Sequence, residues 1–150
     1  MNQSQTARSR EDLLLAALYA SPLKALSPVQ VQKAIFLISQ EAKSHLPPKF
    51  YKFEKYNYGP FCQQLYNDLG VFAAHGLLAV EQPADNRVRI YRLTATGAAQ
   101  GKAVSADLSA PLRDYIERVA KWVTSLPFPD LIREIYQRYP EYKENSIFSG

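Results

Sequence analysis

Apolar residues recur at spacings of three and four positions in two stretches near the start of the chain, a pattern typical of helices. The first stretch predicts a helix over about 10–20, with Ser9 as its N-cap. The second predicts a helix that Ser27 caps, that Pro28 opens and that reaches about Ser44. A Leu-Pro-Pro run follows and forces an extended exit, because a residue before proline is pushed out of the helical region.

An aromatic-rich segment over 50–58 then leads into a third predicted helix. Gly59 and Pro60 are expected to form a structural turn between the two, because glycine takes a positive φ without steric cost and proline suits the first turn of a helix. The buried face of this helix is predicted to carry Leu65, Leu69, Phe72 and Ala73. Two interpretations stay open: a strand-to-helix corner filled by core aromatics, or a helix whose exposed face is a recognition surface.

The second half of the chain first alternates and then returns to helical spacing. Alternation predicts strands over 77–81 and 87–93, joined by a turn at 83–86. Three further helices are predicted, one capped by Thr94 and ending near 105, and two over about 111–125 and 129–139.

Helix, helix, helix and a two-stranded hairpin, in this order and with short joints, is the arrangement of a winged helix. We therefore expect a mainly α fold with a small β hairpin (α+β), in which a winged-helix-like core is followed by C-terminal helices. Residues 1–9 are interpreted as a disordered tail, and residues 10–150 as a single domain with a helical extension. The C-terminal helices are expected to pack against the core or against a second subunit, as a homodimer.

Composition sets limits on the class of protein. The hydrophobic content of 47% is ample for a core, and no apolar run approaches the ~20 residues of a membrane span, so no membrane partner is expected. Cys62 is the only cysteine, which excludes an internal disulfide and is typical of a cytoplasmic protein. The net charge of +4 permits an acidic partner without requiring one.

No catalytic constellation stands out in the sequence. His45 and His75 lie far apart on the ends of predicted elements, and the chain has no nucleotide-binding loop and no zinc-ligand spacing. We therefore expect no catalytic residues, no metal site and no cofactor, and a protein that is not an enzyme.

DNA is a partner to consider, because the third helix of a winged helix enters the major groove. The candidate DNA-binding residues are Lys33, Arg87, Arg89 and Arg92. The third helix argues against DNA, since it carries Asp68 and no Lys or Arg between Pro60 and Leu69. A polar face that is merely solvated is the remaining alternative for this helix.

Several separated segments resemble the Panacea domain family, which includes SocA-like antitoxins and phage-associated GepA-like proteins. The matching segments are Gln-Lys-Ala-Ile-Phe-Leu at 32–37, Tyr-Asn-Tyr-Gly-Pro-Phe at 56–61, Gln-Leu-Tyr-Asn-Asp-Leu at 64–69, Tyr-Arg-Leu-Thr-Ala-Thr-Gly at 91–97 and Tyr-Pro-Glu-Tyr-Lys at 139–143. The stretch over 110–125 departs from this pattern, and a related set of uncharacterised bacterial winged-helix proteins shares the same Tyr-Gly-Pro corner. The resemblance implies a small cytoplasmic protein of a toxin–antitoxin or prophage context that acts through protein contact, in one branch as an adaptor that delivers a toxin to a protease.

The leading hypothesis is a non-enzymatic protein-interaction module, antitoxin- or adaptor-like, that neutralises or delivers a partner protein such as a toxin or the protease machinery. Its predicted partner-binding residues lie in the aromatic segment and on the exposed side of the third helix: Tyr56, Tyr58, Gln63, Gln64, Tyr66 and Asn67. The alternative is a winged-helix DNA-binding transcriptional regulator.

Overall fold

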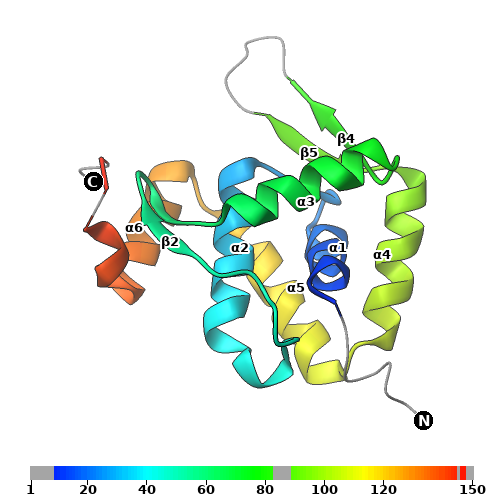
Figure 1. Ribbon diagram of the computed structural model, residues 1–150, viewed down its shortest axis with the longest axis horizontal. Helices are drawn as coiled ribbons and strands as arrows, with labels where there is room; N and C mark the ends of the chain where they lie inside the picture. Colours follow the sequence, from blue (N-terminus) through cyan, green and yellow to red (C-terminus); the bar gives the residue numbers. More distant parts are fainter. Residues whose placement is uncertain (1–8, 83–88, 145, 148–150) are drawn as a thin grey trace.

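Helices dominate the structure, and two small antiparallel sheets complete it (Figure 1). The computed structural model describes residues 9–82, 89–144 and 146–147. In chain order the elements are α1 (Arg10–Ala20), β1 (Ala25–Leu26), α2 (Pro28–Glu41), the 3-10 helix η2 (Lys43–His45), β2 (Glu54–Tyr56), β3 (Gly59–Phe61), α3 (Gln63–Ala74), β4 (Leu78–Glu81), β5 (Ile90–Leu93), α4 (Ala95–Asp107), α5 (Ala110–Ser125), α6 (Phe128–Arg138) and the 3-10 helix η3 (Pro140–Lys143). The predicted α+β class is confirmed. The expected turn at 83–86, Arg87 and most of the expected N-terminal tail lie outside the described residues.

The first part of the chain has a winged-helix-like arrangement. α1, α2 and α3 are followed by the β4–β5 hairpin, and β1 pairs with β5, giving the sheet order β1-β5-β4. β1 is too short to produce an alternating pattern, since it has two residues. Its pairing with β5 depends on a partner far along the chain, so the sequence pattern gave no sign of it.

Side-chain caps start the first two helices where the sequence predicts. The Ser9 hydroxyl accepts a hydrogen bond from the Asp12 N–H at 3.1 Å. Ser27 and Gln30 form a full capping box, in which each side chain bonds the other residue's N–H. α2 leaves the α-helical conformation at Ala42, before the expected end near Ser44, and continues as the 3-10 turn η2.

The aromatic segment forms a hairpin with β3, and this corrects the expectation for Pro60. Pro60 lies in β3, opposite Lys55 of β2, and α3 begins later, with Cys62 as its N-cap. A two-stranded sheet tolerates a proline, because an edge position needs no N–H for a further strand. Gly59 has a φ of +100°, so the predicted need for a positive φ at this turn is confirmed.

The C-terminal helices pack against the winged-helix-like core of the same chain. α4 and α5 contact α1, α5 also contacts α2, and α6 contacts β3 (Figure 1). Buried apolar residues of α5 and α6 join the core. The buried faces of α5 and α6 are therefore covered within the chain. The homodimer stays a prediction.

Close packing explains the two glycines of α4. A Cβ at Gly97 would lie 2.0 Å from the carbonyl oxygen of Leu77, and a Cβ at Gly101 would lie 2.8 Å from the Cβ of Tyr19. Both distances are shorter than a carbon atom allows, so α4 approaches the start of the hairpin and α1 only because these residues are glycines.

Candidate interaction site

The side chain of Gln32 holds the main chain at the start of α3. Its Nε2 donates to the carbonyl oxygen of Cys62 at 3.0 Å, and the Cys62 N–H donates to its Oε1 at 2.9 Å. Gln32 is buried, so both bonds form away from water. The β3–α3 junction is thereby fixed to α2 although it lies thirty residues further along the chain.

Lys33 reaches the same junction from the next position of α2. Its Nζ donates to the carbonyl oxygen of Pro60 at 3.2 Å, and the residue is 4% exposed. Burial disfavours the charged ammonium and lowers the pKa of Lys33 to about 7. Lys33 therefore cannot serve as one of the predicted DNA-binding residues, because it faces the protein interior.

Asp68 also points inward, which corrects its interpretation as a negative charge on the recognition face. Its Oδ2 accepts from the Tyr51 hydroxyl at 2.6 Å and from Arg10 Nε at 2.9 Å. Burial and the bond to Asp68 raise the pKa of Tyr51, and the bond to Asp68 raises the pKa of Arg10. These contacts join α1, the segment before β2, and α3, and they leave uncharged side chains on the exposed N-terminal part of α3.

Aromatic side chains line the surface beside this part of α3. Tyr56 and Phe61 have ring centroids 4.9 Å apart, and Phe61 contacts Tyr66 edge-on at 5.3 Å. Further along the hairpin, the ring of Tyr58 packs edge-on against that of Phe128 of α6, with the ring centroids 5.4 Å apart. We call these five residues the aromatic face.

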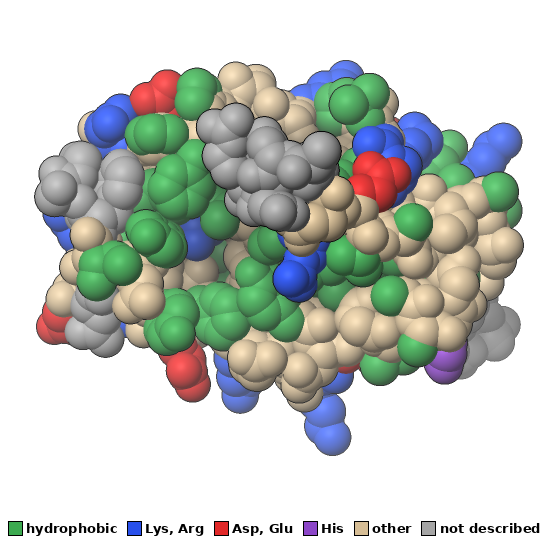
Figure 2. Space-filling view, turned by 90° about the horizontal axis from the view of Figure 1, so that it is seen from above, with side chains coloured by type: hydrophobic (Ala, Val, Ile, Leu, Met, Phe, Trp, Pro, Cys, Tyr) green, Lys and Arg blue, Asp and Glu red, His purple; other side chains and the backbone are tan. Residues whose placement is uncertain are grey.

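The aromatic face is accessible. The exposed fractions are 52% for Tyr56, 40% for Tyr58 and 42% for Phe128. Figure 2 views the molecule from above α3, and it shows hydrophobic side chains gathered on the side of the β2–β3 hairpin and α6. Phe50 and Tyr51 fill the core, as the first interpretation of this segment expects, while Tyr56 and Tyr58 face solvent. That this surface recognises a partner stays a prediction.

The predicted partner-binding residues divide between two neighbouring places. Gln63, Gln64 and Asn67 are exposed on α3, where the Gln63 side-chain amide donates to Asn67 Oδ1 at 3.2 Å, and Phe61 connects this side of α3 to Tyr56. Tyr58 lies apart from them, against α6. The sequence reasoning missed Phe61, because it placed this residue inside the helix. It also missed Phe128, whose position between two prolines gave no helical pattern.

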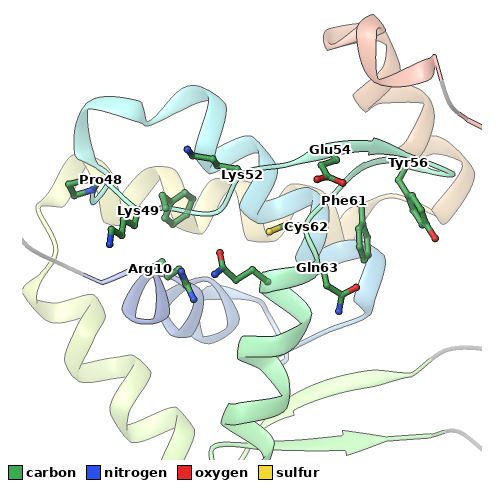
Figure 3. A pocket seen from close by; sticks show the side chains of 11 residues that line it. Arg10, Pro48, Lys49, Lys52, Glu54, Tyr56, Phe61, Cys62 and Gln63 are labelled. Carbon is green, nitrogen blue, oxygen red and sulfur yellow. The ribbon is translucent and has the colours of Figure 1, made fainter.

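A groove of about 640 Å³ runs beside the N-terminal end of α3 (Figure 3). We call it the basic groove, because three of its lining side chains are cationic and one is acidic. Its lining residues are Arg10, Pro48, Lys49, Phe50, Lys52, Glu54, Tyr56, Phe61, Cys62, Gln63 and Gln64. In Figure 3, Lys49 and Arg10 lie toward one side of the view, and Phe61 and Tyr56 lie toward the other.

A second, smaller groove lies between α3 and the β4–β5 hairpin. It has about 390 Å³, and Arg89 is exposed on its wall together with Tyr66 and Asn67. Arg92, another predicted DNA contact, instead pairs with Glu81 at 2.8 Å and donates to the carbonyl oxygen of Leu23 at 3.2 Å. Among the described candidates for DNA contact, Arg89 is the one that faces outward next to α3.

Neither a metal centre nor a membrane span is found in the part of the chain that the structure describes. Within it, no three His, Cys, Asp or Glu side chains come together in a way that could hold a metal ion. None of its helices has both the length and the apolar character that crossing a membrane requires. Cys62 is buried at the junction that Gln32 holds.

Comparison with known proteins assigns the chain to no family. No family model, no curated protein and no solved structure matches the chain significantly.

Proposed function

We propose that this chain is a non-enzymatic protein-interaction module, antitoxin- or adaptor-like, that binds a partner protein through the aromatic face and the adjoining exposed side of α3. The observation that carries the proposal is the exposure of three large aromatic side chains: Tyr56 and Tyr58 of the β2–β3 hairpin, and Phe128, which packs against Tyr58. Tyrosines are enriched among the residues that dominate protein–protein binding energy, because they bury a large area at a low cost in conformational entropy.

The scaffold beneath this surface supports the proposal. Gln32 and Lys33 bond the main chain that precedes α3, and Asp68 ties α3 to Tyr51 and Arg10. A surface held in this way loses little freedom on binding, so more of the contact energy is available as affinity.

The resemblance to the Panacea domain family supports it as well. Its segments at 32–37, 56–61 and 64–69 meet in space, because Lys33 donates to the main chain of Pro60 and the ring of Phe61 contacts that of Tyr66. On this proposal the protein acts in the bacterial cytoplasm, in a toxin–antitoxin or prophage context, and it neutralises a partner or delivers it to a protease.

Co-purification with the product of the neighbouring open reading frame tests the proposal. We expect the wild-type chain to retain this product, and the double variant Tyr56→Ala with Tyr66→Ala to lose it. Leu23→Ala is the matched control, because Leu23 is an apolar residue that is 72% exposed, and it neighbours Arg92 and is not part of the aromatic face. The proposal is contradicted if the wild-type chain does not retain the product, or if the wild type, the double variant and Leu23→Ala retain it equally.

A DNA-binding transcriptional regulator is the second candidate, and the position of Arg89 favours it. Arg89 lines the groove beside α3, and the exposed amides of Gln63, Gln64 and Asn67 have the chemistry to contact adenine edges. Arg89→Ala should weaken binding about equally on all sequences and reduce the salt slope by roughly one phosphate contact. This candidate fails if the chain binds promoter DNA no better than random duplex at physiological salt.

A further inference from the structure

We infer that the basic groove receives an acidic segment of the partner protein, with carboxylates toward Lys49 and Lys52 and an apolar side chain toward Phe61 and Tyr56. This inference rests on the proposed function, which it deepens by naming the chemistry of the partner. It is carried by the distribution of charge and aromatic rings along one groove (Figure 3).

The two ends of the groove differ in chemistry. Lys49 and Lys52 are exposed, and within the described part of the chain neither forms an ion pair. Arg10 adds a third cation, although Asp68 already accepts two hydrogen bonds from it. At the other end, the rings of Tyr56 and Phe61 lie 4.9 Å apart and offer apolar area.

The main chain adds to the positive potential. α3 begins at the groove, its N-cap Cys62 makes no side-chain capping bond, and its first two residues, Gln63 and Gln64, line the wall. The first N–H groups of a helix and its dipole favour an anion at this position. The lysines and the helix end therefore act in the same direction.

A polypeptide segment suits this groove better than a nucleic acid. Glu54 begins β2 and lines the groove, and in the chain it lies between Lys52 and Tyr56. A nucleic acid carries a phosphate on every nucleotide, so along this groove one of its phosphates would lie near the Glu54 carboxylate and be repelled by it. A peptide can place its acidic residues at one end only. The rings of Tyr56, Phe61 and Tyr66 also pack on one another, which leaves less free ring face for the stacking of bases.

The volume is consistent with a short segment. A groove of about 640 Å³ lies within the range of pockets that bury a small ligand, which corresponds to a few side chains of a peptide. Such a contact selects among partners by charge, because like charges across an interface are strongly unfavourable.

Selection of random peptides displayed on phage against the full chain tests the inference. We expect the enriched peptides to carry clustered Asp or Glu next to an aromatic or large aliphatic residue. Synthetic versions of them should bind the double variant Lys49→Glu with Lys52→Glu at least ~10-fold more weakly than the wild type. The double variant Lys102→Glu with Lys121→Glu is the matched control, because it makes the same change in net charge at exposed sites on α4 and α5.

A second probe, a fluorescein-labelled single-stranded oligonucleotide of mixed sequence, distinguishes a nucleic-acid groove. The inference is overturned if no peptide pool is enriched, if the enriched peptides lack acidic residues, if both double variants bind them alike, or if the oligonucleotide binds more tightly than the peptides and depends on the same lysines. The selection does not use the neighbouring gene product. If the peptide selection fails but the chain retains the neighbouring gene product, only the groove assignment is overturned and the proposed function stands. If the selection succeeds but that product is not retained, only the proposed function is overturned and the groove assignment stands.

Discussion

The carboxamide of Gln32 and the main chain of Cys62 exchange two hydrogen bonds, at 3.0 and 2.9 Å, in the way that two neighbouring strands would. Only a side chain that offers one donor and one acceptor in a plane can satisfy both the N–H and the C=O of one residue. This pair connects α2 to the point where the hairpin gives way to α3, and it sets the position of both surfaces proposed here for binding.

Loss of this pair should be costly. Gln32→Leu keeps the size of the side chain but leaves the Cys62 N–H and C=O without partners, and an unsatisfied buried polar group costs about 1–3 kcal/mol. We expect the free energy of unfolding, measured by urea denaturation, to fall by roughly 2–4 kcal/mol. Gln40→Leu, at a half-exposed position of α2, is the control and should change stability little. Equal effects of the two substitutions would show that the bonds to Cys62 contribute nothing specific.

Gly59 should tolerate no side chain. Its φ of +100° is unfavourable for alanine, and a Cβ there would lie 3.2 Å from Cε1 of Tyr136. We expect Gly59→Ala to lower the free energy of unfolding by about 1–3 kcal/mol.

The same substitution at Gly70, Gly70→Ala, should stabilise the protein instead. Gly70 lies within α3, and a Cβ there would meet no atom within 4 Å. Alanine should therefore raise the free energy of unfolding by roughly 0.5–1 kcal/mol, because it favours the helix and restricts the unfolded chain. Thermal melts of the two variants should shift in opposite directions, and a raised midpoint for Gly59→Ala would refute the strain at this turn.

Lys33 should make stability depend on pH. Burial lowers its pKa from 10.5 to about 7, so between these values the unfolded chain binds more protons than the folded one. The free energy of unfolding should then rise with pH in this window, by up to about 1.4 kcal/mol per pH unit, and the contribution of Lys33 should be flat below it.

The variant Lys33→Met isolates this effect, because it has no group to titrate. The stability of the wild type relative to Lys33→Met should rise between pH 7 and 9, as measured by urea denaturation at several pH values. Lys102→Met, at an exposed position of α4, should show no such trend. Parallel curves for the wild type and Lys33→Met would mean that the buried ammonium keeps an ordinary pKa.

Asp68 should stabilise the fold rather than contact a partner. Asp68→Asn removes the charge that Arg10 and Tyr51 share, and one amide oxygen cannot replace two carboxylate oxygens. We expect a loss of about 1–3 kcal/mol in the free energy of unfolding, with partner affinity of the folded protein unchanged. Asp114→Asn, at an exposed position of α5, is the control. A loss of affinity at unchanged stability would place Asp68 in the interface instead.

Signals that lie within a few residues of each other were sufficient for much of the fold. Ser9 and Ser27 start their helices because a cap needs only the next turn of the same chain. The positive φ of Gly59 follows from a local turn, and the apolar spacing of α5 follows from its own periodicity. These features need no knowledge of distant segments.

Contacts between distant segments decided the rest. Lys33 and Asp68 have side chains that usually face water, and only their pairing with Pro60 and with Arg10 and Tyr51 turns them inward. Pro60 joined a strand rather than a helix because β2 pairs with it. The candidate site belongs to this second class, since the basic groove combines α1, the segment before β2 and the start of α3. No periodicity within one segment could have assembled these parts, because their proximity is a product of packing.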